Sequence, residues 1–132
     1  KKDGYFVHSF RDIHPLTLED RFPISPNYSV LDKLLEKMEK KLKLKQILRI
    51  RASLFPRREA QKPDAFHVDY KFDHKVCIFY INSNNGYTLF KSGEKIESVE
   101  NRLLIFDGQK EHSTVVQTDT SARYIININV IL

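Results

Sequence analysis

Cysteine and long apolar runs are nearly absent from this chain of 132 residues, and each absence excludes a class of protein. The single cysteine, Cys77, excludes an intramolecular disulfide framework and a zinc site built from cysteines. Cys77 lies in an apolar run, where we expect a buried, inert thiol, and this use of cysteine favours a cytoplasmic protein. No apolar run approaches the roughly 20 residues that a membrane-spanning helix needs, so we expect no membrane partner.

The net charge of +5 is concentrated in one part of the chain. Six lysines crowd residues 33–45, and four arginines follow within residues 49–58. A basic face of this kind can bind nucleic acid or an acidic protein. However, Glu36 and Glu39 interleave with the lysines, which favours a solvated helix face. No aromatic residue interrupts the lysine stretch, so a platform for base stacking is not indicated there.

The length suits one domain with one core, and we expect it to span residues 1–132. Residues 1–27 contain three prolines and predict an entry segment with one short strand at Tyr5–Phe10. Residues 29–43 predict the one clear helix, with Ser29 as its N-cap. Five apolar residues fall at helical spacing on one face of it, namely Leu31, Leu34, Leu35, Met38 and Leu42.

After this helix the hydrophobic period changes to two, and residues 47–132 read as a β region. Ile47–Phe55 alternates like a strand and is stopped by Pro56. Further short strands are predicted near Ala65–Tyr70, Lys75–Asn82, Thr88–Phe90, Arg102–Phe106, Ser113–Gln117 and Arg123–Ile131. Many short strands with short loops predict a mostly β fold, closed or sandwiched and antiparallel, with the helix packed on its outside.

His67-Val68-Asp69 is the motif that most directly indicates chemistry. In a strand, residues i and i+2 project from the same face, so the imidazole and the carboxylate would point to one site while Val68 packs behind. A metal needs a third ligand, for which we predict His112, with His74 as the competing candidate. Two histidines and one carboxylate on one face of a metal are typical of non-heme Fe(II) oxygenases.

Arg123 adds a second signal, because ten residues separate it from His112. If the two residues lie on strands joined by a turn at 118–121, both can face the interior across one hairpin. An arginine that points into a small barrel is costly unless an anion meets it. A dicarboxylate cosubstrate would supply that anion and take the guanidinium in a two-bond fork.

Several segments share their pattern with one known family. Besides His112, the matching segments are residues 66–69, 78–82, 86–90, 101–107 and 123–129, and the strand at 49–56 also fits. In these segments the chain resembles the 2-oxoglutarate/Fe(II) oxygenase superfamily, in its prolyl-4-hydroxylase-like branch, and looks closest to small members from phages and marine bacteria. The resemblance implies a double-stranded β-helix, the jelly roll shared with cupins, in which His67, Asp69 and His112 bind Fe(II).

The same resemblance implies residues for the cosubstrate. Arg123 would pair with the distal carboxylate of 2-oxoglutarate, and Tyr80 stands where prolyl hydroxylases place a tyrosine hydroxyl on that carboxylate. Thr88 and Asn127 would line the cosubstrate pocket. Asn129 shares the inward parity of Arg123 and either supports the ligands from behind or faces a solvated groove. Many prolyl hydroxylases carry Lys in place of Arg123, which leaves the precise subfamily open.

The implied activity is hydroxylation coupled to oxidative decarboxylation of 2-oxoglutarate to succinate and carbon dioxide, with dioxygen as oxidant and ascorbate as an auxiliary reductant. By resemblance, the favoured substrate is a protein or peptide hydroxylated at a prolyl residue. Two alternatives stay open: a nucleic-acid base oxygenase or demethylase, which the basic segment would support, and a non-catalytic cupin-like binding module. We expect a monomer in the cytoplasm, or in the host cytoplasm if a phage encodes it.

Overall fold

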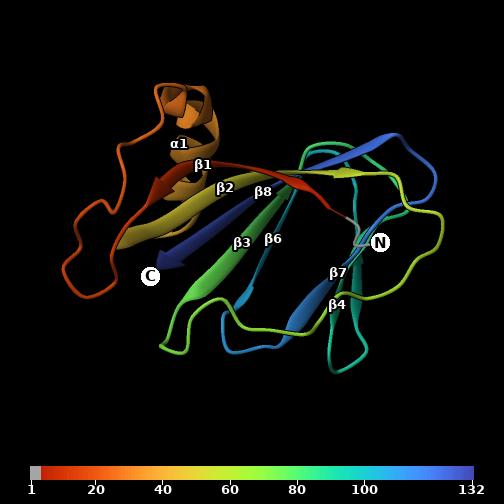
Figure 1. Cartoon of the computed structure of the whole chain (residues 1–132). Coiled ribbons are helices and arrows are strands. Elements are labelled where there is room, and N and C mark those ends of the chain that lie inside the picture. Colours follow the sequence, from red (N-terminus) through yellow and green to blue (C-terminus); the bar gives the residue numbers. More distant parts are fainter. Residues whose placement is uncertain (1–3) are drawn as a thin grey trace.

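Two antiparallel sheets and one helix make up the computed structural model, which describes residues 4–132 (Figure 1). The larger sheet has the order β1 (Phe6–Asp12), β2 (Gln46–Pro56), β8 (Ala122–Ile131), β3 (Lys75–Tyr80), β6 (Arg102–Asp107). The smaller sheet has the order β5 (Lys95–Glu97), β4 (Tyr87–Phe90), β7 (His112–Val115). The arrangement is a double-stranded β-helix, so the predicted fold class is confirmed. The first three residues of the predicted entry segment lie outside the described residues.

The core between the sheets follows from strand alternation. Ile78 on β3 and Ile125 on β8 point inward and pack with Phe90 and Phe106. Their chain neighbours point outward, as Cys77 and Ile126 do. β3 is therefore apolar on both faces, because its inner face meets the smaller sheet and its outer face needs a separate cover.

The helix supplies that cover for the outer face. A short 3-10 helix, η1 (Tyr28–Leu31), leads into α1 (Asp32–Lys41), whose Met38 is 1% exposed and joins the outer cluster with Ile50 and Ile128. The predicted N-cap was wrong, since Ser29 lies within η1, and α1 begins after Leu31 without a side-chain cap. The six lysines of residues 33–45 are all exposed, as expected for a solvated helix face.

One predicted strand was wrong, and one strand was missed. Residues 65–70 form no strand, and only His67 pairs there, in a single bridge with His112. A regular ladder continuing from the bridge between Pro63 and Val115 would place His67 opposite Glu111, so one extra residue interrupts the pairing. The sequence analysis also missed β5, a strand of only three residues, two of them charged.

The predicted hairpin between the strands of His112 and Arg123 was also wrong. β7 belongs to the smaller sheet and β8 to the larger sheet, and the chain crosses between them through residues 116–121. The two side chains therefore approach the interior from opposite sheets. Arg123 on β8 donates a hydrogen bond to Thr114 on β7, which joins the two sheets across the interior.

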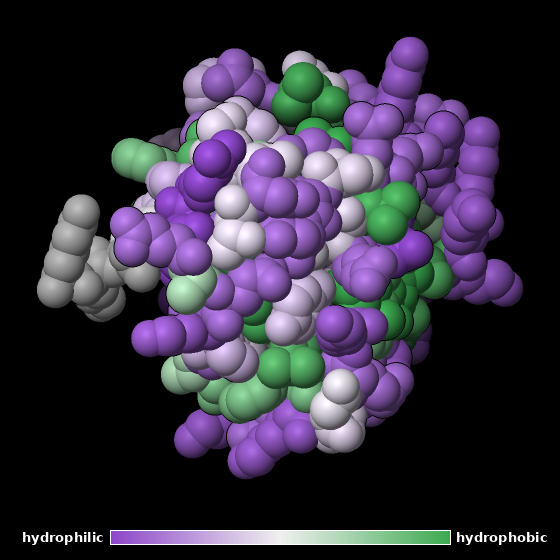
Figure 2. Space-filling model, turned by 90° about the vertical axis from the view of Figure 1, so that its right-hand side faces the viewer, coloured by the Kyte–Doolittle hydropathy of each residue, from purple (hydrophilic) through white to green (hydrophobic). Residues whose placement is uncertain are grey.

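Two observations describe the exterior. On the face shown in Figure 2, polar side chains predominate and the apolar ones form scattered small groups. Among residues 4–132, no helix is long and apolar enough to cross a membrane.

Ile128 tests how far stability depends on the cluster between helix and sheet. It is fully buried in the outer cluster. We expect Ile128→Ala to lower the free energy of unfolding by about 2–5 kcal/mol, because it removes buried methyl groups and leaves a cavity. Val30→Ala is the control, since Val30 is 74% exposed, and its effect should stay within about 0.5 kcal/mol. Chemical denaturation measures both, and equal effects would contradict the packing described here.

Candidate metal centre

Three side chains converge at the open end of the space between the sheets. One possible ligand atom from each of His67, Asp69 and His112 lies within 4.8 Å of the others. Oδ1 of Asp69 is 3.3 Å from Nε2 of His67 and 3.7 Å from Nε2 of His112. His67 and Asp69 come from the segment between β2 and β3, while His112 is the first residue of β7. The structure thus brings together the three residues predicted as metal ligands.

The backbone orients both imidazole rings. Nδ1 of His67 lies 3.2 Å from the carbonyl oxygen of Ala65, and Nδ1 of His112 lies 3.1 Å from that of Lys110. A carbonyl oxygen only accepts hydrogen bonds, so each Nδ1 carries the proton and donates. The lone pair of each neutral ring is then on Nε2, the nitrogen that faces Asp69. This is the usual way in which proteins prepare a histidine to bind a metal.

The carboxylate of Asp69 stays ionised despite its burial, with only 4% of the side chain exposed. Burial by itself raises the pKa of Asp69, but hydrogen bonds from Nε2–H of protonated His67 and from Asn129, together with the nearby charge of Arg49, outweigh it. The pKa of this carboxyl therefore lies well below its usual range. An ionised carboxylate is the form that binds a metal.

The two histidines differ in their protonation. The hydrogen bond to Asp69 raises the pKa of His67 above 6.5. Burial lowers the pKa of His112 below 6.5, so His112 is neutral at pH 7. Binding of a metal must therefore displace a proton from His67 more often than from His112.

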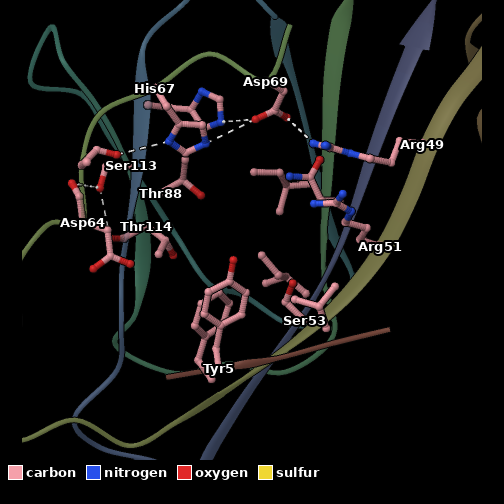
Figure 3. Close-up of a pocket in the computed structure, with 17 residues that line it drawn as sticks. Tyr5, Arg49, Arg51, Ser53, Asp64, His67, Asp69, Thr88, Ser113 and Thr114 are labelled. Carbon is pink, nitrogen blue, oxygen red and sulfur yellow. Dashed lines mark hydrogen bonds and ion pairs between the residues drawn. The ribbon is translucent and has the colours of Figure 1, made fainter. Parts of the chain in front are cut away.

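A cavity of about 340 Å³ opens beside the cluster (Figure 3). His67, Asp69 and His112 line it, together with alternate residues of β2, which are Arg49, Arg51, Ser53 and Phe55. Two of the residues predicted for the cosubstrate pocket, Thr88 and Asn127, also line this cavity. Figure 3 shows Arg49 reaching toward Asp69, with Thr88 below His67.

Arg123 lies behind one wall of the cavity and is 0% exposed. Its Nε donates to Ser98 at 3.0 Å and its Nη1 donates to Thr114, a cavity-lining residue, while Nη2 is buried without a hydrogen-bond partner. Burial lowers its pKa to about 10, so the guanidinium is charged at neutral pH. Within residues 4–132, no carboxylate lies at ion-pair distance from it.

Two other candidates, Tyr80 and His74, are not among the residues that line the cavity. The hydroxyl of Tyr80 lies 2.6 Å from that of Thr88, a cavity-lining residue, and both side chains are buried. His74 stays outside the metal cluster. It is buried beside Tyr70, and its Nδ1 donates to the carbonyl oxygen of Phe72 at 2.8 Å.

The sequence analysis missed Arg49, which contacts Asp69, and it missed Ser98 and Thr114, which accept hydrogen bonds from Arg123. A signal existed for Thr114, because it stands two residues after His112 and so shares its face of β7. Ser98 lies just after β5, which was not predicted, and Arg49 is displaced by a bulge.

The donor set fits a catalytic metal. It consists of one carboxylate and two imidazoles that can bind a metal through Nε2 in their neutral form. Within the described chain, no fourth His, Cys, Asp or Glu joins it. A structural zinc site is closed by four protein ligands, whereas this set leaves positions open toward the cavity. Two histidines and one carboxylate are the ligands of non-heme Fe(II) oxygenases.

Solved structures offer similar folds. An oxidoreductase of the 2OG-Fe(II) oxygenase family from Burkholderia pseudomallei has a TM-score of 0.71 and 10% identity, with 97% of this chain and 68% of that chain covered. The viral collagen prolyl hydroxylase vCPH of Paramecium bursaria Chlorella virus-1, in complex with 2OG, has a TM-score of 0.64 and 12% identity, with 82% of this chain and 75% of that chain covered. No family model and no curated protein matches the sequence. At these identities, the comparison establishes a shared fold.

Asp69→Asn tests the electrostatic coupling within the cluster. In metal-free protein we expect this change to lower the pKa of His67, because the carboxylate that stabilises the protonated ring is lost. An NMR titration of the histidine ring signals measures the shift. Asp64→Asn is the matched control, since Asp64 lines the same cavity but pairs with Arg58. An unchanged His67 pKa in Asp69→Asn would contradict the coupling.

Proposed function

We propose that this protein is an Fe(II)- and 2-oxoglutarate-dependent dioxygenase that hydroxylates its substrate. One observation carries the proposal: an open cluster of two histidines and one carboxylate shares a cavity wall with a buried arginine that lacks an anion. Thr114, which contacts Arg123, stands two residues along β7 from His112. That separation is about 7 Å at the usual rise of a strand, a distance that a five-carbon dicarboxylate can span.

In this proposal the residues divide into two groups. His67, Asp69 and His112 hold Fe(II), which supplies, together with dioxygen and 2-oxoglutarate, the oxidative decarboxylation that drives hydroxylation. Arg123 binds the distal carboxylate of 2-oxoglutarate, and Nη2 provides the donor that has no partner within the chain.

Burial supports this role for Arg123. A charged guanidinium enclosed by protein is costly unless its donors are satisfied and an anion balances its charge. The hydroxyls of Ser98 and Thr114 accept two of its hydrogen bonds, but they carry no charge. The hydroxyl pair of Tyr80 and Thr88 lies nearby and offers a further hydrogen bond to the same carboxylate.

A peptide substrate is favoured over a nucleic-acid base. The resemblance to prolyl hydroxylases supports a prolyl target, and one structure of similar fold is a collagen prolyl hydroxylase. The basic segment that would support a nucleic acid is divided: its six lysines lie on and just after α1, which packs on the outer face of the larger sheet, whereas Arg49 and Arg51 line the cavity on the inner face. The open ligand set beside Arg123 also argues against a non-catalytic binding module.

Succinate formation tests the proposed reaction. Protein reconstituted with Fe(II) and ascorbate should convert 2-oxoglutarate to succinate, faster when a proline-rich peptide is added. His112→Ala should abolish this turnover because it removes a metal ligand. His14→Ala is a matched control, since His14 lies outside the cluster. Iron-dependent succinate formation that is equal in wild type and His112→Ala would refute the assignment, and its absence in the wild type would favour the binding module.

Arg123→Gln tests the cosubstrate site separately from turnover. With Mn²⁺ as a redox-silent ion, we expect the Kd of 2-oxoglutarate to rise about thirtyfold or more, because loss of one partner of a buried charge pair costs roughly 2 kcal/mol or more. Calorimetry measures binding, and thermal unfolding checks the fold. Arg102→Gln is the control, since Arg102 donates only to the carbonyl oxygen of Glu97. If Arg123→Gln does not fold, Thr114→Val tests the same pocket, and an unchanged Kd would contradict the role.

A further inference from the structure

The two oxygens of the Asp69 carboxylate have different surroundings. Oδ1 faces Nε2 of both His67 and His112. Oδ2 points the other way, where it accepts a hydrogen bond of 2.8 Å from Nδ2 of Asn129 and lies 3.6 Å from Nη2 of Arg49. The torsion that turns a carboxylate about its last bond is broad and roughly two-fold. The side chain of Asp69 therefore does not determine by itself which oxygen faces the histidines.

Asn129 is held so that it can only donate to Asp69. The residue is 0% exposed, and its Oδ1 accepts a hydrogen bond of 3.2 Å from Nε of Arg49. A guanidinium has no acceptor, so this contact assigns the oxygen of the amide to Arg49 and the NH₂ group to Asp69. Arg49 in turn lies over the ring of Tyr70, 5.3 Å from its centre. Asp69, Asn129 and Arg49 thus form a closed ring of contacts.

A β-bulge makes this ring possible. On β2, Ile47 pairs with Val130 but Arg49 pairs with Asn129, so Leu48 is the extra residue. Without it, Leu48 would stand opposite Asn129, and Arg49 would share the outward face of Ile47. The bulge reverses the alternation and turns Arg49 to the cavity side, directly beside Asn129.

We propose that Asn129, oriented by Arg49, is a positioning residue that holds Oδ2 of Asp69 and leaves Oδ1 as the single oxygen presented to the metal. The inference rests on the proposed function, since it assigns a task to residues behind the metal ligands. Three elements supply the ring: β8, β2 and the segment between β2 and β3. Mutation of a residue that hydrogen-bonds a metal ligand typically weakens metal binding about ten- to hundredfold, and we expect an effect in this range here.

Binding of Co²⁺ to metal-free protein tests the inference without turnover. Asn129→Leu keeps the approximate volume and removes both hydrogen bonds, so the Kd of Co²⁺ should rise roughly ten- to hundredfold. The visible absorption of the bound ion should also change, because either oxygen of Asp69 can then bind. Gln117→Leu is the matched control: Gln117 is also 0% exposed, but its amide donates to the carbonyl oxygens of Phe55 and Thr120 and not to Asp69. Its Kd should stay close to that of the wild type.

Arg49→Lys gives a second variant in case Asn129→Leu does not fold. It keeps the positive charge and removes the Nε–H that orients the amide, so we expect a smaller rise in the Kd of Co²⁺ in the same direction. Thermal unfolding without metal separates positioning from stability, since a purely structural residue would lower the Tm and leave the Kd and the Co²⁺ spectrum unchanged. That result would overturn the inference alone. Equal Co²⁺ binding by wild type and His112→Ala would instead overturn the metal centre itself.

Discussion

Two backbone hydrogen bonds between His67 and His112 are the contact on which the site depends. The amide of each residue donates to the carbonyl oxygen of the other at 3.0 Å. Residues that exchange both bonds stand directly opposite each other, so their side chains leave from the same face. Four strands, β3 to β6, lie between His67 and His112 in the sequence, and this single bridge brings the two imidazole rings together, with their centres 4.5 Å apart. Asp69 joins the two histidines because it follows His67 by only two residues.

Irregular pairing, rather than regular sheet, supplies the polar groups of the cavity. The extra residue between Pro63 and His67 brings His67 opposite His112, and the extra Leu48 brings Arg49 beside Asn129. In both places a regular ladder would have turned the other face of the strand inward. Bulges commonly redirect a side chain near a functional site. The extra residue stays unpaired, and the residues after it point to the opposite face of the sheet.

The sequence contained much of this arrangement in local patterns. Spacing by two residues placed His67 and Asp69 together, although the segment is held by one bridge and not by a strand. Alternation also placed Arg123, Asn127 and Asn129 on the inner face of β8, which is where the structure has them. Partners in space were harder to predict, because the ten residues between His112 and Arg123 are compatible with a hairpin and with a crossing between sheets. Simple alternation from Ile47 also puts Arg49 on the wrong face, since nothing in the residue types marks Leu48 as the extra one.

The two ends of the cavity differ in how far the protein alone satisfies them. At the metal end, every ring nitrogen and carboxylate oxygen that does not face the cluster already has a partner, so the ligands are held before any ion arrives. At the end near Arg123, a buried cation lacks both a hydrogen-bond partner for Nη2 and a balancing charge. A ligand that binds only the folded state stabilises it, by an amount that grows with the logarithm of its concentration relative to its Kd. In the proposed enzyme, the dicarboxylate therefore relieves an electrostatic cost that the metal leaves in place, and the fold is completed by its cosubstrate as much as by its ion.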